Sequence, residues 1–186
     1  MRIGVDVGGT NLAAGLMDDN YNIVCKDSVP ANGKRPSQEI VADIIMLCQR
    51  LIEKAGLTSK DIKSIGIGIP GYADSKAGVV GHCANINLNN IPLSKMITDK
   101  LGIPVFLAND ADCAALGESI AGATAGSDNS VMITIGTGIG GGIIIDGKLL
   151  KGKSGAAGEM HFKMYSDKRR KCTCGSWDCF EAYASG

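Results

Sequence analysis

The junction at Asn109-Asp110 holds the side chains best suited to acid–base chemistry. Pro104 to Ala108 is typical of a strand, and Ala111 to Ala121 is typical of a helix. Ligands of α/β proteins usually bind where a strand gives way to a helix, and a carboxylate there can accept the proton of an attacking hydroxyl. Asp is also a strongly favoured helix N-cap. By position alone, Asp110 is therefore either a general base or a structural cap.

Two glycine-rich turns, each flanked by short apolar runs, could bind phosphate. Gly8-Gly9-Thr10 lies within residues 3–17, and the turn of residues 136–142 lies within residues 131–145. The β-branched flanks favour strands, and glycine lacks the Cβ that would keep backbone N–H groups away from a phosphate chain. The likeness of the two segments indicates an internal duplication, with two hairpins around one phosphate chain. A mobile glycine loop is the alternative for each turn.

Better-known nucleotide motifs do not account for these turns. Gly136 to Gly141 and Gly66 to Gly71 both match G-x-G-x-x-G, but neither is followed by the helix that a dinucleotide-binding motif needs. The sequence contains no G-x-x-x-x-G-K-[ST].

Three clustered cysteines indicate a metal site. They are spaced Cys172-x-Cys174-x4-Cys179, which in a cytosolic protein favours metal over a disulfide. Three thiolates and one imidazole make a closed, structural zinc site, and His161 is the nearest histidine. Three free thiols are the alternative.

Composition narrows the function classes. Of the 186 residues, 19 are Lys or Arg and 19 are Asp or Glu, and aromatic residues make up 4%. We therefore expect no nucleic-acid partner. No apolar run approaches the roughly 18 residues of a membrane helix, and a strand is expected directly after Met1. These features predict a cytoplasmic protein without a membrane partner.

The predicted elements run β-β-β-α-β-α-β-α and then β-β-β. This order predicts an α/β fold with a mixed sheet and helices. Residues 122–129 are small and polar and are typical of a hinge. We expect one domain at residues 1–122 and the beginning of a second at residues 129–186.

Five motifs, in order, give the chain a family resemblance over essentially all its residues. They are Asp6-x-Gly8-Gly9-Thr10-Asn11, Asn109-Asp110-Ala111, the turn from Gly136 to Gly142, Ala157-Gly158-Glu159, and Cys172-x-Cys174-Gly175-x3-Cys179-x-Glu181. The chain resembles the ROK family, and the bacterial glucokinases in particular. The resemblance implies the actin-like ATPase fold, with two ribonuclease-H-like domains, and ATP-dependent phosphorylation of a hexose.

The resemblance also implies a role for individual residues. Asp110 corresponds to the family's catalytic base, and Asp6 to the residue that helps hold the Mg²⁺ accompanying ATP. The implied sugar contacts are Asn109, Asp110, Glu159, His161 and Glu181, with Gly71 and Asn85 as weaker candidates. The implied nucleotide contacts are Asp6, Gly8, Gly9, Thr10, Asn11, Thr137, Gly138 and Gly140. The metal ligands are His161, Cys172, Cys174 and Cys179.

Several departures from the family pattern keep alternatives open. Glu159-Met160-His161 is one residue shorter than the family's Glu-x-Gly-His, and Ala108 and Leu88 replace a frequent Glu and Trp. N-acetylmannosamine, N-acetylglucosamine, fructose or mannose thus remain alternatives to glucose, and polyphosphate an alternative donor. A sugar-binding ROK regulator and a non-catalytic fragment are the alternative functions. We expect a homo-oligomer (a dimer or tetramer), and we expect the 186-residue chain alone to be inactive because the second domain is predicted to be partial.

Overall fold

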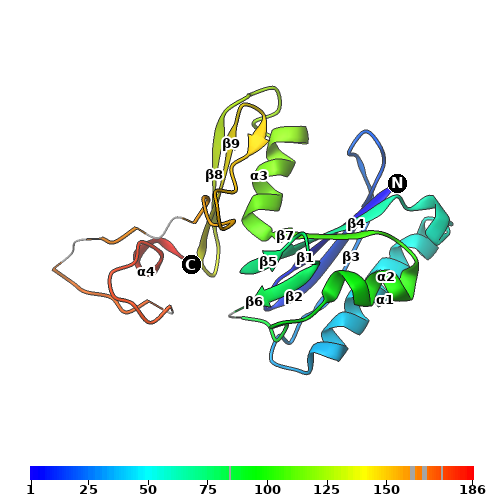
Figure 1. The fold of residues 1–186 in the computed structure, drawn as a ribbon, viewed down its shortest axis with the longest axis horizontal. Coiled ribbons are helices and arrows are strands. Elements are labelled where there is room, and N and C mark those ends of the chain that lie inside the picture. The colour runs from blue at the N-terminus through cyan, green and yellow to red at the C-terminus, as the bar shows by residue number, and fades with distance from the viewer. Residues whose placement is uncertain (84, 160–161, 165–166, 173) are drawn as a thin grey trace. The chain divides into compact units, whose positions relative to one another are not determined.

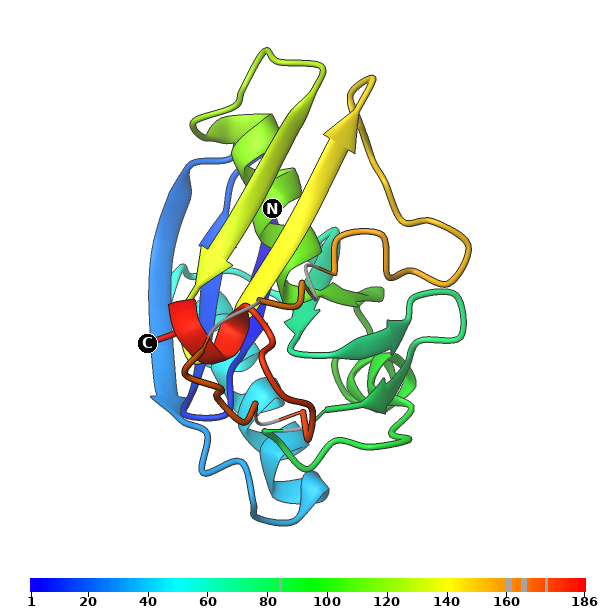
Figure 2. The same cartoon turned by 90° about the vertical axis from the view of Figure 1, so that its left-hand side faces the viewer.

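The protein is described by a computed structural model covering residues 1–83, 85–159, 162–164, 167–172 and 174–186. Figure 1 and Figure 2 trace the chain from two directions. It divides into two compact units, Met1–Asp110 and Ala111–Gly186.

A five-stranded mixed sheet forms the centre of the first unit, in the order β3-β2-β1-β4-β7. The strands are β1 (Arg2–Val7), β2 (Asn11–Met17), β3 (Ile23–Pro30), β4 (Ser64–Ile69) and β7 (Val105–Asn109). The first three form the predicted antiparallel meander, whereas β4 pairs in parallel with both β1 and β7. Parallel pairing brings the carboxyl ends of β1, β4 and β7 to one edge of the sheet.

Two helices complete the core of this unit. Helices α1 (Ser37–Lys54) and α2 (Leu93–Leu101) contact the sheet and each other, α1 over β2 and β3 and α2 over β7 (Figure 1). Alternate strand residues point toward the helices, as the period of two in a strand requires. The fully buried side chains include Ile3, Leu12, Leu16, Ile40, Ile44, Leu47, Leu51, Ile65 and Ile67.

A short hairpin that was not predicted follows β4. Strands β5 (Tyr72–Asp74) and β6 (Val79–His82) pair antiparallel. Asp74 Oδ1 accepts hydrogen bonds from the amides of Lys76 and Ala77, and Gly78 has φ +68°. The turn is thus held by an aspartate side chain and a left-handed glycine.

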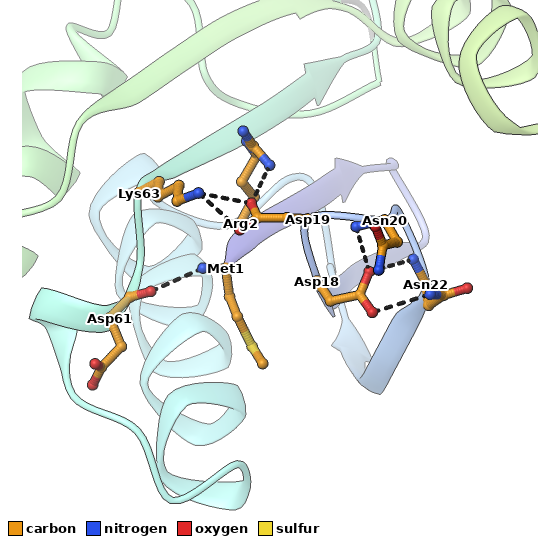
Figure 3. A network of polar contacts seen from close by, with 8 residues as sticks. All are labelled: Met1, Arg2, Asp18, Asp19, Asn20, Asn22, Asp61 and Lys63. Carbon is orange, nitrogen blue, oxygen red and sulfur yellow. Dashed lines mark hydrogen bonds and ion pairs between the residues drawn. The ribbon is translucent and has the colours of Figure 1, made fainter.

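Polar contacts join the start of β1 to two neighbouring segments (Figure 3). Asp19 pairs with both Arg2 and Lys63, and the terminal ammonium of Met1 donates to the Asp61 carbonyl at 3.0 Å. The hydrogen bond from Lys63 lowers the pKa of the Asp19 carboxyl. A lowered pKa means that these contacts favour the folded state at neutral pH and lose that effect as the carboxyl protonates in acid. The group is exposed, so the contribution is small.

The second unit is built on a hairpin. Strands β8 (Ser130–Ile135) and β9 (Ile139–Ile145) pair antiparallel, and β10 (Lys148–Leu149) adds a third strand beside β9. Helix α3 (Asp110–Ala121) precedes them, and a one-turn helix, α4 (Glu181–Ala184), lies near the end of the chain. No helix in the described part of the chain is long and apolar enough to cross a membrane.

Helix α3 packs closely on the hairpin because β9 is rich in glycine. A Cβ on Gly142 would lie 2.4 Å from Ala115 Cβ, and one on Gly140 would lie 2.9 Å from Ala111 Cβ. Both views show the helix running alongside β8 and β9 (Figure 1, Figure 2). The two compact units divide after Asp110, the first residue of α3. The proposed domain limits, 1–122 and 129–186, stay predictions.

One face of β8 is apolar and exposed, as expected from its composition. Val131, Ile133 and Ile135 are 60%, 50% and 70% exposed, and β8 is an outer strand of its sheet. Exposed apolar strands of this kind favour association. The expected homo-oligomer is not tested by this observation and stays a prediction.

The contact between α3 and β9 makes a testable prediction. Gly142→Ala should destabilise the protein by about 1–3 kcal/mol, because the added methyl overlaps Ala115 in a packed interface. Gly117→Ala on α3 is the matched control, since a Cβ there meets no atom within 4 Å. It should be neutral or stabilising by up to about 1 kcal/mol. Urea unfolding of both variants measures the difference, and an unchanged midpoint for Gly142→Ala would contradict the packing.

Candidate functional site

The carboxyl ends of the three parallel strands gather predicted site residues from distant parts of the sequence. Asp6 is paired with Gly68 across β1 and β4, and Ile69 with Asn109 across β4 and β7. Asp110 follows directly as the first residue of α3. This edge of the sheet thus carries the Asp6 carboxylate on β1 and, across β4, the Asn109 amide and the Asp110 carboxylate, and ligands of α/β sheets usually bind at such an edge.

Asn109 ties this edge to the segment that follows β4. Its Nδ2 donates to the Gly71 carbonyl at 3.2 Å. Gly71 has φ +127°, and a Cβ there would lie 2.3 Å from the His82 carbonyl oxygen. Only glycine fits this position, so the weakly predicted Gly71 does lie beside Asn109.

The asparagine-rich loop forms a pocket of about 370 Å³, and one of its lining residues, Cys83, lies near Asp110. Burial, with a smaller effect of the nearby Asp110 charge, raises the pKa of the Cys83 thiol to about 11. Cys83 therefore both lines the pocket and lies near the Asp110 carboxylate. The lining residues are Gly33, Lys34, Cys83, Asn85, Ile86, Asn87 and Asn89.

The pocket includes the predicted Asn85 and several residues that were not predicted. Cys83, Asn87 and Asn89 were missed, although the loop's wealth of asparagine was visible in the sequence. The amide of Cys83 donates to Asn89 Oδ1 at 2.8 Å, so Asn89 shapes the loop. Only folding shows which asparagines face the pocket.

The first glycine turn packs against this same loop. A Cβ on Gly9 would lie 2.9 Å from the Asn85 carbonyl oxygen, and Gly8 N donates to the Asn11 carbonyl at 2.9 Å. Thr10 and Asn11 are exposed. Asp6, at the end of β1, is solvent-accessible on one side, while partial burial raises the pKa of its carboxyl.

The second glycine turn lies in the other unit and is tied to Glu181. Gly136 N donates to the Gly138 carbonyl at 3.0 Å, and Ile139 N donates to Glu181 Oε2 at 3.0 Å. Glu159 follows Gly158, and a Cβ added to Gly158 would lie 2.3 Å from the Gly141 carbonyl oxygen. Both predicted glutamates thus belong to segments that contact the hairpin. His161 lies outside the described residues, and its predicted roles stay predictions.

Three cysteines meet in the second unit with a geometry that suits one metal ion. Their sulfur atoms lie within 4.8 Å of one another, and Cys174 Sγ is 3.6 Å from Cys179 Sγ. Tetrahedral zinc, with Zn–S distances of about 2.3 Å, places its sulfurs about 3.8 Å apart. Hydrogen bonds to the sulfur, first from the Ser176 amide, lower the pKa of Cys174 to about 7. The three thiols thus fit zinc in position and Cys174 also in ease of ionisation, whereas burial raises the pKa of Cys179.

Comparison with known proteins identifies the family of this chain. The sequence profile of the ROK family matches residues 2–186. The chain belongs to the ROK family. This confirms the resemblance inferred from the five motifs.

Relatives within the ROK family include both enzymes and regulators. A glucokinase from Streptomyces coelicolor is 40% identical over 187 residues, which cover 100% of this chain and 56% of that protein. A xylose repressor from Caldicellulosiruptor bescii is 30% identical and is covered over 46% of its length. The chain therefore spans about half the length of the curated relatives that it matches.

A solved structure shows the same fold. A ROK family glucokinase from Streptomyces griseus, crystallised with glucose and AMPPNP, superposes with a TM-score of 0.86 at 39% identity. The match covers 99% of this chain and 57% of that one. This ROK chain therefore has the predicted actin-like ATPase fold.

The cysteine cluster makes the second prediction. The protein purified without chelator should contain about one zinc per chain, because closed thiolate sites bind zinc with roughly 10 kcal/mol or more. Cys174→Ser should lower the zinc content measured by elemental analysis, whereas Cys113→Ser, at an exposed thiol outside the cluster, should not. A folded, zinc-free protein with three titratable thiols at these positions would contradict the site.

Proposed function

We propose that this chain provides the sugar- and phosphate-binding elements of an ATP-dependent hexose kinase whose substrate is glucose. The observation that carries the proposal is the sheet edge where Asp110 lies near Cys83, which lines the pocket of the asparagine-rich loop. A carboxylate beside a polar pocket of about 370 Å³ suits a small polyhydroxylated ligand. The similarity to glucokinases supports glucose.

In this proposal Asp110 is the general base. It accepts the proton of the sugar hydroxyl as that oxygen attacks the γ-phosphate of ATP. Asn109 supplies a donor and an acceptor for neighbouring hydroxyls, and its bond to Gly71 fixes its orientation. The other proposed sugar contacts are Asn85, Glu159, His161 and Glu181.

The nucleotide is proposed to bind the two glycine turns. Gly8, Gly9, Thr10 and Asn11 contact one end of the phosphate chain, and Thr137, Gly138 and Gly140 the other. Asp6 helps hold Mg²⁺, which neutralises charge on the phosphates when it is bound. Desolvation raises the pKa of the Asp6 carboxyl, and a bound Mg²⁺ would lower it again by favouring the charged form.

Zinc in the cysteine loop is proposed to be structural. Cys172, Cys174 and Cys179 supply three ligands, and His161 is the proposed fourth. A closed site of this kind holds a loop in one conformation and takes no part in the reaction.

A sugar-sensing regulator is the second candidate, because a xylose repressor is among the relatives. Such a protein would bind sugar without turnover. The two candidates are separated by a coupled assay on the protein at its native length, with Mg-ATP and each of glucose, mannose, fructose, N-acetylglucosamine and N-acetylmannosamine, and with polyphosphate as an alternative donor. We expect glucose and ATP to give the highest kcat/KM. Hexose binding without turnover would favour the regulator.

The third prediction concerns Asp110. Asp110→Asn should lower kcat by about two to four orders of magnitude, the usual contribution of general-base catalysis. KM for the sugar should change much less, because the amide still hydrogen-bonds a hydroxyl. Asp99→Asn, an exposed carboxylate of the same unit, is the control and should leave kcat unchanged. Near-normal turnover of Asp110→Asn would show that the base lies elsewhere.

The fourth prediction concerns Asp6 and Mg²⁺. Asp6→Asn should raise the Mg²⁺ concentration needed for half-maximal activity by at least about tenfold, the scale on which even residues around metal ligands act. Because burial raises the pKa of Asp6, the Mg²⁺ requirement of the wild type should increase as the pH falls and the carboxyl protonates. Magnesium titrations at several pH values test both effects. A Mg²⁺ requirement equal in variant and wild type would remove Asp6 from the metal site.

A further inference from the structure

Glu181 contacts two functional segments of the second unit at once. Its Oε2 accepts the Ile139 amide at 3.0 Å, and its Oε1 lies 3.5 Å from Cys172 Sγ. Glu181 also follows Cys179 by two residues and begins α4, where Ala182 N donates to the Cys179 carbonyl at 2.9 Å. One carboxylate therefore lies between the cysteine loop and the second glycine turn.

The turn itself has little to hold it in shape. Residues 136–138, which join β8 to β9, hold only one residue with a side chain, Thr137. Glycine has the most conformational freedom to lose on folding, so a glycine turn needs contacts from outside. Two such contacts come from one segment, the Glu181 carboxylate on Ile139 and the Gly186 amide on the Gly136 carbonyl at 2.9 Å. A hydrogen bond to a carboxylate is roughly twice as strong as one between neutral groups.

The same contact divides the amides of the turn into two kinds. Ile139 N–H is directed to Glu181. The amides of Thr137 and Gly138 donate no hydrogen bond within the described part of the chain. These two are the amides that a phosphate oxygen can use without displacing a carboxylate.

We infer that Glu181 is a positioning residue that fixes the second glycine turn to the cysteine loop. Its carboxylate holds Ile139, and the turn then presents Thr137 and Gly138 to a phosphate. The phosphate part of this inference rests on the proposed kinase function, whereas the link between loop and turn does not. Metal in the cysteine loop would hold Cys172, which contacts Glu181, and Cys179, two residues before it, so loss of the metal should loosen the turn.

Amide hydrogen exchange at Ile139 tests the link directly. Glu181→Ala should speed this exchange by roughly ten- to a hundredfold, the protection that a hydrogen bond to a charged acceptor supplies. Glu181→Gln keeps an acceptor oxygen and should restore most of the protection. The other amides of β8 and β9 should stay protected in both variants, which shows that the hairpin is still folded. Equal exchange of Ile139 in wild type and Glu181→Ala would overturn the inference.

A second pair of variants leaves Glu181 in place. A Cβ on Gly138 would lie 2.6 Å from Glu181 Oε2, so Gly138→Ala should displace the carboxylate and speed exchange at Ile139. Gly136→Ala is the matched control in the same turn, because a Cβ there meets no atom within 4 Å. Faster exchange in Gly138→Ala but not in Gly136→Ala supports the contact, and the same rate in both contradicts it.

Removing metal with a chelator tests the coupling to the cysteine loop. Exchange at Ile139 should rise in the wild type, and the chelator should have no further effect in Glu181→Ala. An equal rise in both would show that the coupling bypasses Glu181 and would overturn this part. The affinity for a fluorescent ATP analogue is then measured, and it should fall in Glu181→Ala and recover in Glu181→Gln. If the protein binds no ATP while the Ile139 results hold, the proposed function fails and the positioning role stands.

Discussion

Parallel pairing of β1 with β4, and of β4 with β7, is the constraint on which the first unit depends. Parallel strands bring their carboxyl ends to one edge, so Asp6, Gly71 and Asp110 lie at that edge although about a hundred residues separate the first from the last. The meander and the two helices supply the buried face that makes this pairing stable. Any chemistry at Asp110 therefore relies on the hydrophobic core that holds these strands together.

Close backbone approach plays the corresponding part in the second unit. Glycines in β9 let α3 lie against the hairpin, and Gly158 lets the segment before Glu159 pass over Gly141. At each position, the absence of a side chain lets a helix, strand or loop approach the backbone. The cost is conformational entropy, because glycine loses more freedom on folding than other residues do. The second glycine turn takes its shape from Glu181 and Gly186, which lie more than forty residues further along the chain.

The two units use polar groups differently. In the first unit the polar residues of the sheet edge adjoin a pocket, and partial burial disturbs the ionisation of Asp6 and Cys83. In the second unit, the buried hydrophobic residues of the described C-terminal part are Ile144 and two of the clustered cysteines, Cys172 and Cys179. A loop with so few buried apolar side chains has little hydrophobic packing to order it. A metal site is therefore a physically sensible feature there.

The sequence by itself determined much of this protein. Short β-branched runs on either side of a glycine turn predicted the β1–β2 and β8–β9 hairpins, and the cysteine spacing predicted the sulfur cluster, because these patterns are local. The β5–β6 hairpin was missed because its turn is held by a side chain and a left-handed glycine within very short strands. Only the tertiary structure decided that α3 packs on the β8–β9 hairpin, that Cys83 lies near Asp110, and that Glu181 accepts a hydrogen bond from Ile139. Those contacts join residues distant in the sequence, and no local pattern of residue types encodes which distant segments meet.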